Sequence, residues 1–525
     1  MTMLVMCMAM IRHKETLFDR DGPVYRWLVT TTCLLAFFTM VFSSTMVNVA
    51  IPHVMGAFGV GQDKAQFLST AFLASTVTSL LLNSWLIAKI GQRPAYTVSL
   101  VVFFLGSAIC VFGPTLDWII LGRILQGFAA GIIQPMIMVV LFQVFPPEKR
   151  GLAMAMFSMG VVFALGLGPA LGGLTIDIFN WRYIFLVPIP PALLALAFGL
   201  LFLPERPRTG PAGPFDFIGY ALMCAAVFCL MTIIGNGQRD GWGSNGILTL
   251  AALLVLTTVG FVFSQRRSQS NLLDLRLFKN VRFATAISIS FLFGFGSFAT
   301  VYIFPVFAQI VQGFSATEAG FLLLPGSIAA AFFLPLTGKL ADSFPAQLVI
   351  FIGMMVFAVS VVLMADADID TVFWNIALYL FIGRVGVALV APALNAVALA
   401  ALPASQITRG AGVVNLFLML GGSCGINLLV VILERRIEFH SDALTTTQTS
   451  ANAATMELLY SVRGILNSGG IPDGLHIPVA LNYLGDVVRA QANTLGFQDG
   501  FIAVGLVSMV ALIPVFFLTQ GPKHR

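Results

Sequence analysis

Residues 118–142 read WIILGRILQGFAAGIIQPMIMVVLF, an apolar run that holds a single charged side chain, Arg123. As an α-helix, a run of this length extends about 37 Å, which is enough to cross the roughly 30 Å hydrocarbon core of a bilayer. The run does not alternate between apolar and polar residues, as a strand of a membrane barrel would. It therefore predicts a membrane-spanning helix.

The rest of the chain has the same character. Of its 525 residues, 58% are hydrophobic and only 10% are charged, whereas about a quarter of the residues of a soluble protein carry charge. This composition excludes a soluble globule and a disordered chain, and it predicts an all-α integral membrane protein. We identify fourteen transmembrane helices, at residues 28–51, 65–88, 95–116, 118–142, 152–176, 183–203, 217–235, 246–264, 284–311, 318–341, 347–365, 373–401, 410–433 and 498–519.

The distribution of basic residues predicts the orientation. If the N-terminus is cytoplasmic, then 19 of the 28 Lys and Arg residues lie on the cytoplasmic side, seven lie outside and two lie within spans. Cytoplasmic loops carry the excess of Lys and Arg. We therefore expect a multi-pass protein of the cytoplasmic (inner) membrane, with both termini in the cytoplasm.

An internal repeat divides the chain. Arg123 and Arg384 each follow a glycine, and each is followed eleven residues later by an amide, Gln134 or Asn395. Parallel repeats related by an axis along the membrane normal are typical of transporters, with the substrate site between the halves. The predicted units are an N-terminal cytoplasmic segment 1–27, a six-helix bundle 28–208, an inserted helix pair 209–264, a cytoplasmic linker 265–283, and a pseudo-symmetric six-helix bundle 284–525 with an external loop 434–497.

Polar side chains inside the spans are the candidate site residues. A buried cation costs at least ~2.5–3.5 kcal/mol in a bilayer, so it should face a cavity or a partner. Arg123 and Gln126 fall on one helix face with Gln134, and this face can either bind substrate or tie down neighbouring carbonyl groups. The predicted transport pathway comprises Ser43, Asn48, Arg123, Gln126, Gln134, Arg384 and Asn395.

Several motifs in register resemble the major facilitator superfamily, in its fourteen-helix drug:proton antiporter type (EmrB/QacA-like). They are LGRILQG at 121–127, ALGLGPALGG at 164–173, WRYIF at 181–185, FDFIG at 215–219, GQRDGW at 237–242 and LLDLRLF at 272–278. The resemblance implies multidrug efflux by alternating access with proton antiport. It also implies an antiporter-motif helix and gating loops, whose residues are Gly168, Pro169, Gly172 and Gly173 for the helix and Lys89, Arg93, Lys339 and Asp342 for the loops.

The sequence departs from the family pattern at its acids. The first-helix motif usually carries an aspartate, but here it reads Ser43-Ser44-Thr45, and Ala88 replaces the acid after the second helix. No Asp or Glu lies well inside a predicted span. The nearest acids lie at span ends or in loops; they are Asp63, Asp177, Asp216, Glu318, Asp342, Asp366 and Glu434. The two arginines bias the cavity towards anionic or neutral substrates. An organic-anion facilitator or exchanger without proton coupling is therefore an alternative, and a non-transporting scaffold or receptor is a weaker one.

The remaining expectations concern ligands and partners. The chain has five histidines, no HExxH and no GxxxxGK[ST] motif, so we expect no catalytic site, no metal, no cofactor and no direct use of ATP. No basic soluble domain is present to bind nucleic acid. We expect a monomer in membrane lipid that acts on a small molecule. The resemblance adds protons and a periplasmic adaptor protein as partners, and the 434–497 loop can be a cap, a docking element or a linker.

Overall fold

The computed structural model describes residues 23–145, 150–203, 215–267, 272–403 and 406–518, and for parts of α7 and α13 it describes the backbone alone. The described residues form helices and no strands. Thirteen helices in these ranges are long and apolar enough to span a bilayer, and α7 adds a shorter apolar stretch, Ala164–Ile178. The all-α membrane fold predicted from the sequence is confirmed, and all fourteen predicted spans fall on helices.

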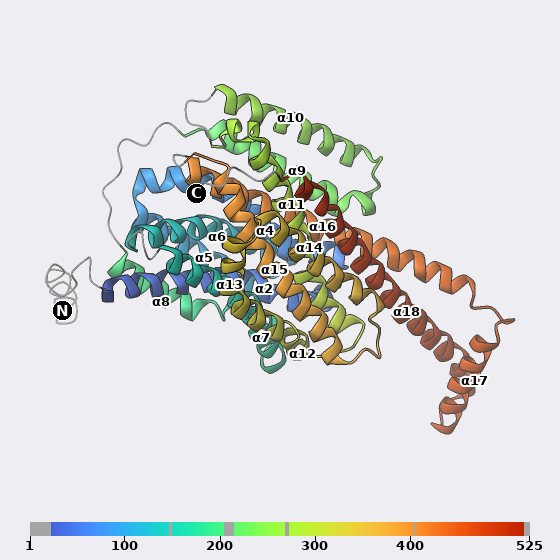
Figure 1. The fold of residues 1–525 in the computed structure, drawn as a ribbon. Coiled ribbons are helices and arrows are strands. Elements are labelled where there is room, and N and C mark those ends of the chain that lie inside the picture. Colours follow the sequence, from blue (N-terminus) through green and yellow to red (C-terminus); the bar gives the residue numbers. More distant parts are fainter. Residues whose placement is uncertain (1–22, 146–149, 204–214, 268–271, 404–405, 519–525) are drawn as a thin grey trace, which may run out of the picture.

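Two groups of six spanning helices form the body of the protein (Figure 1). The first group is α2 (Pro23–Phe58), α4 (Phe67–Ile90), α5 (Gln92–Phe112), α6 (Leu116–Val144), α7 (Arg150–Ile178) and α8 (Ile189–Phe202). The second group is α11 (Val281–Ile310), α13 (Leu324–Ser343), α14 (Ala346–Leu363), α15 (Phe373–Ala400), α16 (Ile407–Thr446) and α18 (Asp473–Val510). Short helices join or extend these: α3 (Gln62–Ala65), η2 (Trp181–Phe185), η3 (Leu275–Lys279), α12 (Ala316–Phe321), η4 (Met364–Asp366) and α19 (Leu512–Phe516).

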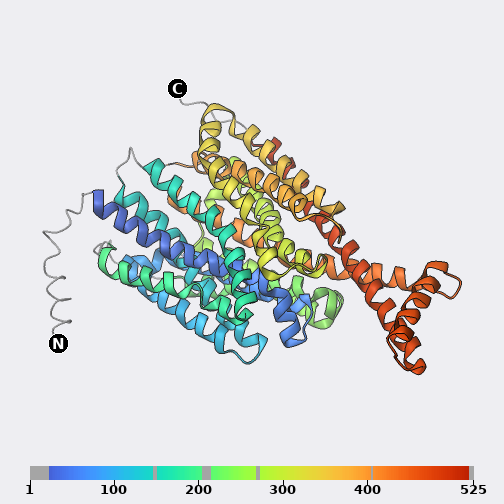
Figure 2. The same cartoon turned by 90° about the horizontal axis from the view of Figure 1, so that it is seen from below.

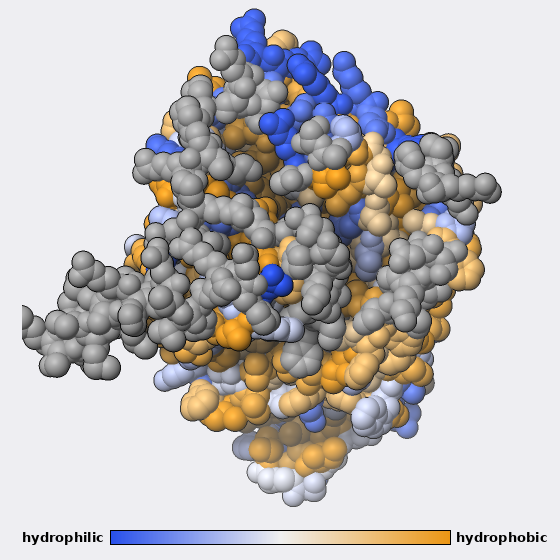
Figure 3. Space-filling view, turned by 60° about the vertical axis from the view of Figure 1, so that its left-hand side comes forward, coloured by the Kyte–Doolittle hydropathy of each residue, from blue (hydrophilic) through white to orange (hydrophobic). Residues whose placement is uncertain are grey.

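The inserted pair, α9 (Phe217–Asp240) and α10 (Asn245–Arg267), lies along one flank of the body (Figure 1). Asp216 ties the two helices together, because its carboxylate caps α9 at Gly219 N (2.8 Å) and accepts a hydrogen bond from Gln265 of α10 (2.8 Å). Apolar side chains of α10 are 42–68% exposed; they are Leu248, Leu253, Val255, Leu256, Val259 and Phe263. Such an exposed apolar face fits a helix that contacts lipid. Figure 3 shows another face of the molecule, on which hydrophobic residues gather towards the lower right and hydrophilic residues gather at the top.

Residues 434–497 differ from the expected loop. α16 continues unbroken to Thr446, α17 (Ala453–Ser468) follows, and α18 begins at Asp473. Together they form a helical hairpin that projects from the body (Figures 1 and 2). At its root, the carboxylate of Asp499 accepts hydrogen bonds from Arg436 Nε (2.5 Å) and from His440 Nε2 (2.7 Å). The external side and the domain boundaries remain predictions, and residues 1–22 of the predicted N-terminal segment lie outside the described ranges.

The two halves meet at the end of the body that carries the hairpin. Within the described residues, every hydrogen bond between the halves lies in the half of the spans nearest this end. These bonds are Asn48 Nδ2 to Val301 O (3.3 Å), Gln309 Nε2 to Val49 O (2.9 Å), Thr317 N to Asp177 Oδ2 (2.8 Å), Ser423 Oγ to Thr70 O (3.3 Å) and Asp63 N to Glu434 Oε1 (2.7 Å). The outer end, as the charge distribution predicts it, is therefore closed.

Candidate functional site

Arg123 lies inside the first half with no solvent exposure. Its Nε donates to Leu68 O of α4 (2.7 Å), and one terminal nitrogen donates to Ser43 O of α2 (2.9 Å), to Ser43 Oγ (3.0 Å) and to Gln126 Oε1 (2.8 Å). The guanidinium also stacks 4.4 Å from the centre of the Phe72 ring. Arg123 thus links three helices, and its charge is held by neutral oxygens and a ring.

Gln126 extends this network to a fourth helix. Its Nε2 donates to Ser107 Oγ of α5 at 2.8 Å, and its Oε1 also accepts from Ser43 Oγ at 3.1 Å. The other terminal nitrogen of Arg123 is buried without a hydrogen-bond partner. The fold therefore brings together three of the predicted site residues, Ser43, Arg123 and Gln126. Because these groups largely satisfy one another, the arrangement is that of a structural anchor between helices.

The other predicted amides lie elsewhere. Asn48 accepts from Ser69 Oγ at 2.6 Å and bonds across the interface to Val301, so it belongs to the contact between halves. Gln134 is half-buried on α6. Asn395 is exposed, and its amide donates to Ala391 O of its own helix at 3.0 Å. The equal spacing of Gln134 and Asn395 in sequence does not give them equal surroundings.

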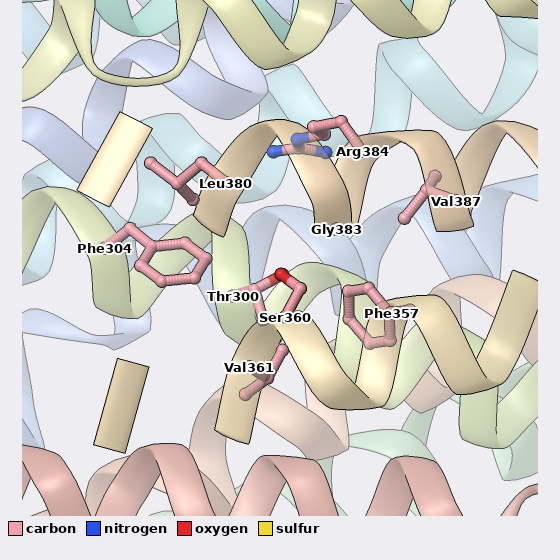
Figure 4. A pocket seen from close by; sticks show the side chains of 9 residues that line it. All are labelled: Thr300, Phe304, Phe357, Ser360, Val361, Leu380, Gly383, Arg384 and Val387. Atoms are coloured by element: carbon pink, nitrogen blue, oxygen red, sulfur yellow. The ribbon is translucent and has the colours of Figure 1, made fainter. Parts of the chain in front are cut away.

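Arg384 lines a cavity within the second half (Figure 4). It is 7% exposed, and none of the hydrogen bonds or ion pairs between described residues involves it. Figure 4 shows its guanidinium extending back along α15 towards Leu380. The other residues that line the cavity are Thr300, Phe304, Phe357, Ser360, Val361, Leu380, Gly383 and Val387. The space between them admits roughly one water molecule.

The glycines of α7 allow two different close approaches. A Cβ on Gly168 would lie 2.1 Å from Thr45 Oγ1, and one on Gly172 would lie 3.2 Å from Met46, both in α2 of the same half. A Cβ on Gly173 would lie 2.0 Å from the carbonyl oxygen of Ala316, in the other half. Pro169 stands inside the helix between them. Small residues let helices approach closely in membranes, and here they do so both within and between the halves.

The predicted gating loops are only partly described. Lys89 lies in the last turn of α4 with its ammonium 4.6 Å from the centre of the Trp85 ring, and half-buried Arg93 lies in the first turn of α5. Between them, Gly91 turns the chain with φ +91°, a conformation that favours glycine. Lys339 and Asp342 belong to the part of α13 whose side chains lie outside the described residues.

Glu434 is a functional candidate that sequence reasoning did not single out. Its carboxylate accepts the backbone N–H of Asp63 at 2.7 Å and so joins the two halves at the end of the body that carries the hairpin. It lies one residue beyond the predicted span 410–433. Burial, together with the nearby Asp63 carboxylate, raises the pKa of Glu434 to about 7. Both acids can be located at span ends from the sequence, but only the fold brings them together.

Comparison with known proteins decides the family. A profile described as Major Facilitator Superfamily matches residues 33–426, three quarters of the chain. The chain belongs to the major facilitator superfamily. The two-halved helical body described above is consistent with this superfamily, in which parallel repeats are related by an axis along the membrane normal.

Superfamily relatives match over nearly the full length. The chain is 30% identical to the "Probable multidrug resistance protein EmrY" of Escherichia coli, over 84% of this chain and 88% of that protein. It is 28% identical to the "Fatty acid resistance protein FarB" of Neisseria gonorrhoeae, over 96% and 97%. It is 29% identical to the "Multidrug transporter protein MdtP" of Bacillus subtilis, over 93% of each. The resemblance to EmrB-like multidrug transporters is confirmed.

Solved structures share the superfamily fold. One is a bacterial homologue of the human lysosomal transporter Spinster, inward-facing and unoccupied, with a TM-score of 0.63, 16% identity, and coverage of 95% of this chain and 97% of that one. Another is a POT family transporter in complex with 5-aminolevulinic acid, with a TM-score of 0.64, 13% identity, and coverage of 94% and 96%. At such identities the likeness concerns the fold alone. Taken with the superfamily match, it makes the chain a multi-pass membrane transporter.

Proposed function

We propose that this protein is a secondary active transporter that exports small organic molecules across the cytoplasmic membrane by alternating access with proton antiport. The observation that carries the proposal is the closed outer end. Two similar halves meet there through short hydrogen bonds of Asn48, Asp63, Asp177, Gln309 and Ser423, and through apolar side chains of both halves that pack in one core. Contacts of this kind can break and reform as the halves rock, exposing a central site to each side in turn.

The relatives support small organic molecules as the substrates, since the names of two of the three refer to multidrug resistance or multidrug transport. The test is a panel of toxic compounds applied to cells with and without the gene, repeated with a protonophore. We expect the gene to raise tolerance to some compounds, and the protonophore to abolish the difference. Equal tolerance throughout the panel, with the protein present in the membrane, would contradict the proposal.

Glu434 is our candidate proton carrier. Its pKa is raised in the closed arrangement, whereas a solvated glutamate titrates near 4.3. The state with the higher pKa binds the proton more tightly, so lowering the pH favours the closed outer end, and raising the pH through about 7 favours opening. A proton taken up from outside would then drive the return of the empty transporter to its outer-closed state. The charged groups around Glu434 are Asp63, Arg239 and Glu438.

An organic-anion facilitator without proton coupling is the second candidate function. Arg384 favours it, because this buried cation has no acidic partner within the described residues. The protonophore arm of the experiment separates the two candidates. Transport that persists without a proton gradient, and that follows only the anion gradient, would support the facilitator.

The projecting hairpin is our candidate docking element for a periplasmic adaptor. Apolar side chains on it are widely exposed, including Tyr460 (64%), Ile465 (69%) and Ile477 (65%). Exposed apolar residues in such number are typical of interaction surfaces. Cysteine labelling of intact cells tests the orientation first: a cysteine at 450 should react from outside, and one at 272 should not. Labelling at 272 alone would reverse the topology.

A further inference from the structure

Arg123 and Arg384 occupy equivalent positions in the two halves. They are separated by 261 residues, and a glycine precedes each. A Cβ on Gly122 would lie 2.5 Å from Cys110 Sγ of α5, and a Cβ on Gly383 would lie 2.4 Å from Ser360 Oγ of α14. Each arginine-bearing helix is therefore pressed against the helix that precedes it in its own half. The same backbone setting holds both arginines.

The two arginines differ in the residue one turn further along. Gln126 follows Arg123 by three residues and accepts its hydrogen bond at 2.8 Å. The residue that follows Arg384 by three is Val387, which has no polar atom to offer. The two hydroxyl groups that line the Arg384 cavity each donate to a carbonyl: Thr300 to Ser297 O (2.8 Å) and Ser360 to Tyr379 O (2.7 Å). The partner of the second arginine is therefore missing where the repeat would supply it.

A buried cation without a partner is costly, and an arriving anion offsets that cost. The planar guanidinium matches the two oxygens of a carboxylate. Phe304, Phe357 and Val361 make the surroundings apolar. The space admits about one water molecule as it stands, so a carboxylate enters only when the lining side chains move apart. We propose that Arg384 binds the carboxylate head group of an amphipathic organic acid. This inference rests on the proposed transport function, because it names the substrate class.

The position of Arg384 also connects binding to the movement of the halves. Thr300, in the cavity wall, adjoins Val301, whose carbonyl accepts the interface bond from Asn48. A Cβ on Gly326 would lie 2.9 Å from Arg384 Cγ, and the next residue, Ser327, contacts Gly166 of the other half. The aliphatic part of the Arg384 side chain therefore packs against Gly326, the residue next to the surface at which the halves meet.

The experiment measures binding to the purified full-length protein in detergent, with a dansyl-labelled medium-chain fatty acid and its methyl ester as matched probes. The acid differs from the ester by its charge, so a charged hydrogen bond at Arg384 predicts tighter binding of the acid, on the order of 10- to 100-fold in Kd. Arg384→Gln should remove this preference and leave ester binding within about 2-fold. Equal binding of acid and ester by the unmodified protein would overturn the proposal.

A second variant tests the missing partner. Val387→Gln recreates the residue that satisfies Arg123, so it should reduce the preference for the acid about 10-fold without removing the charge. Val387→Met, of similar length but without an amide, should retain a larger preference. If both variants lose the preference for the acid equally, the effect comes from the size of the side chain at 387. That result would overturn the argument that Arg384 lacks a polar partner there.

Failure of the carboxylate assignment can be distinguished from failure of the proposed export function. Binding needs no transport, so the acid preference can be measured even if the cell assay shows no export. If export of neutral compounds persists in Arg384→Gln while the probes show no preference in either protein, only the carboxylate assignment fails. If chloride displaces the acid as effectively as acetate does, the site takes any small anion, and the assignment to an organic head group is overturned.

Discussion

Gly173→Ala should prevent the outer end from closing. The new Cβ would lie 2.0 Å from the carbonyl oxygen of Ala316 and 2.8 Å from the Cα of Thr317, both backbone atoms that cannot rotate away. An ordinary carbon–oxygen contact is about 3.3 Å or more, so α7 and α12 must separate by roughly 1 Å. Overpacking of this kind costs about 1–3 kcal/mol, which shifts a two-state equilibrium by roughly 5- to 150-fold.

The neighbouring glycine supplies the control. A Cβ on Gly172 would lie 3.2 Å from Met46, within the same half, so Gly172→Ala should strain the packing of that half without separating the two halves. Spin labels at Phe179 and Ile369, both exposed near the outer end, report the distance between the halves in lipid vesicles. We expect a longer-distance population in Gly173→Ala, and a distribution like that of the unmodified protein in Gly172→Ala.

Export should fall together with this change, because the transporter would return only rarely to its outer-closed state. Two results would refute the reasoning. One is an unchanged distance distribution with normal export in Gly173→Ala. The other is the same change in both variants, which would assign the effect to α7 itself and not to its contact with α12.

Three further predictions concern other parts of the molecule. Arg123→Ala removes four hydrogen bonds at roughly 0.6 kcal/mol each in a membrane interior; it should lower stability by about 2 kcal/mol in thermal unfolding, and an Arg384→Ala protein equally destabilised would speak against the structural role. Glu434→Gln mimics the protonated acid and should keep the outer end closed from pH 5.5 to 8, whereas the unmodified protein opens as the pH rises through about 7; a pH-independent distance in the unmodified protein would remove Glu434 as the sensor. Asp499→Asn weakens the bonds to Arg436 and His440, so amide exchange in the hairpin should rise several-fold without loss of vesicle transport, and unchanged exchange would show that the hairpin is held elsewhere.

The membrane fold was predictable because its signal is local. Each spanning helix is a long apolar run. In lipid, the backbone N–H and C=O groups of such a run must bond to one another, and the α-helix is the structure that achieves this within one segment. The hairpin was not predictable in the same way. Residues 434–497 mix Thr, Gln and Asn with scattered apolar residues, and nothing in that composition indicates that α16 and α18 continue as helices beyond the membrane. Their pairing, fixed at Asp499 by Arg436 and His440, is a tertiary contact.

The candidate site also depends on tertiary contacts that the sequence does not reveal. The sequence places Arg123 and Arg384 at equivalent positions of a repeat, so it predicts similar surroundings for both. What separates them is supplied by other helices: Leu68 O and Phe72 of α4 reach Arg123, whereas none of the described residues bonds to Arg384. Val387 in place of an amide was visible in the sequence, but its meaning depends on knowing that Gln126 is a partner of Arg123.

The hairpin converts small rotations of the second half into large movements outside the membrane. α16 and α18 each run without a break from the body into the hairpin. The second half and the base of the hairpin therefore rotate together as one rigid unit. The part of α18 before residue 498 is about 25 residues, or roughly 38 Å, long. For every 10° that the second half tilts, the tip therefore sweeps about 6–7 Å. A molecule held against Ile465 or Ile477 would be pushed and released once in each transport cycle.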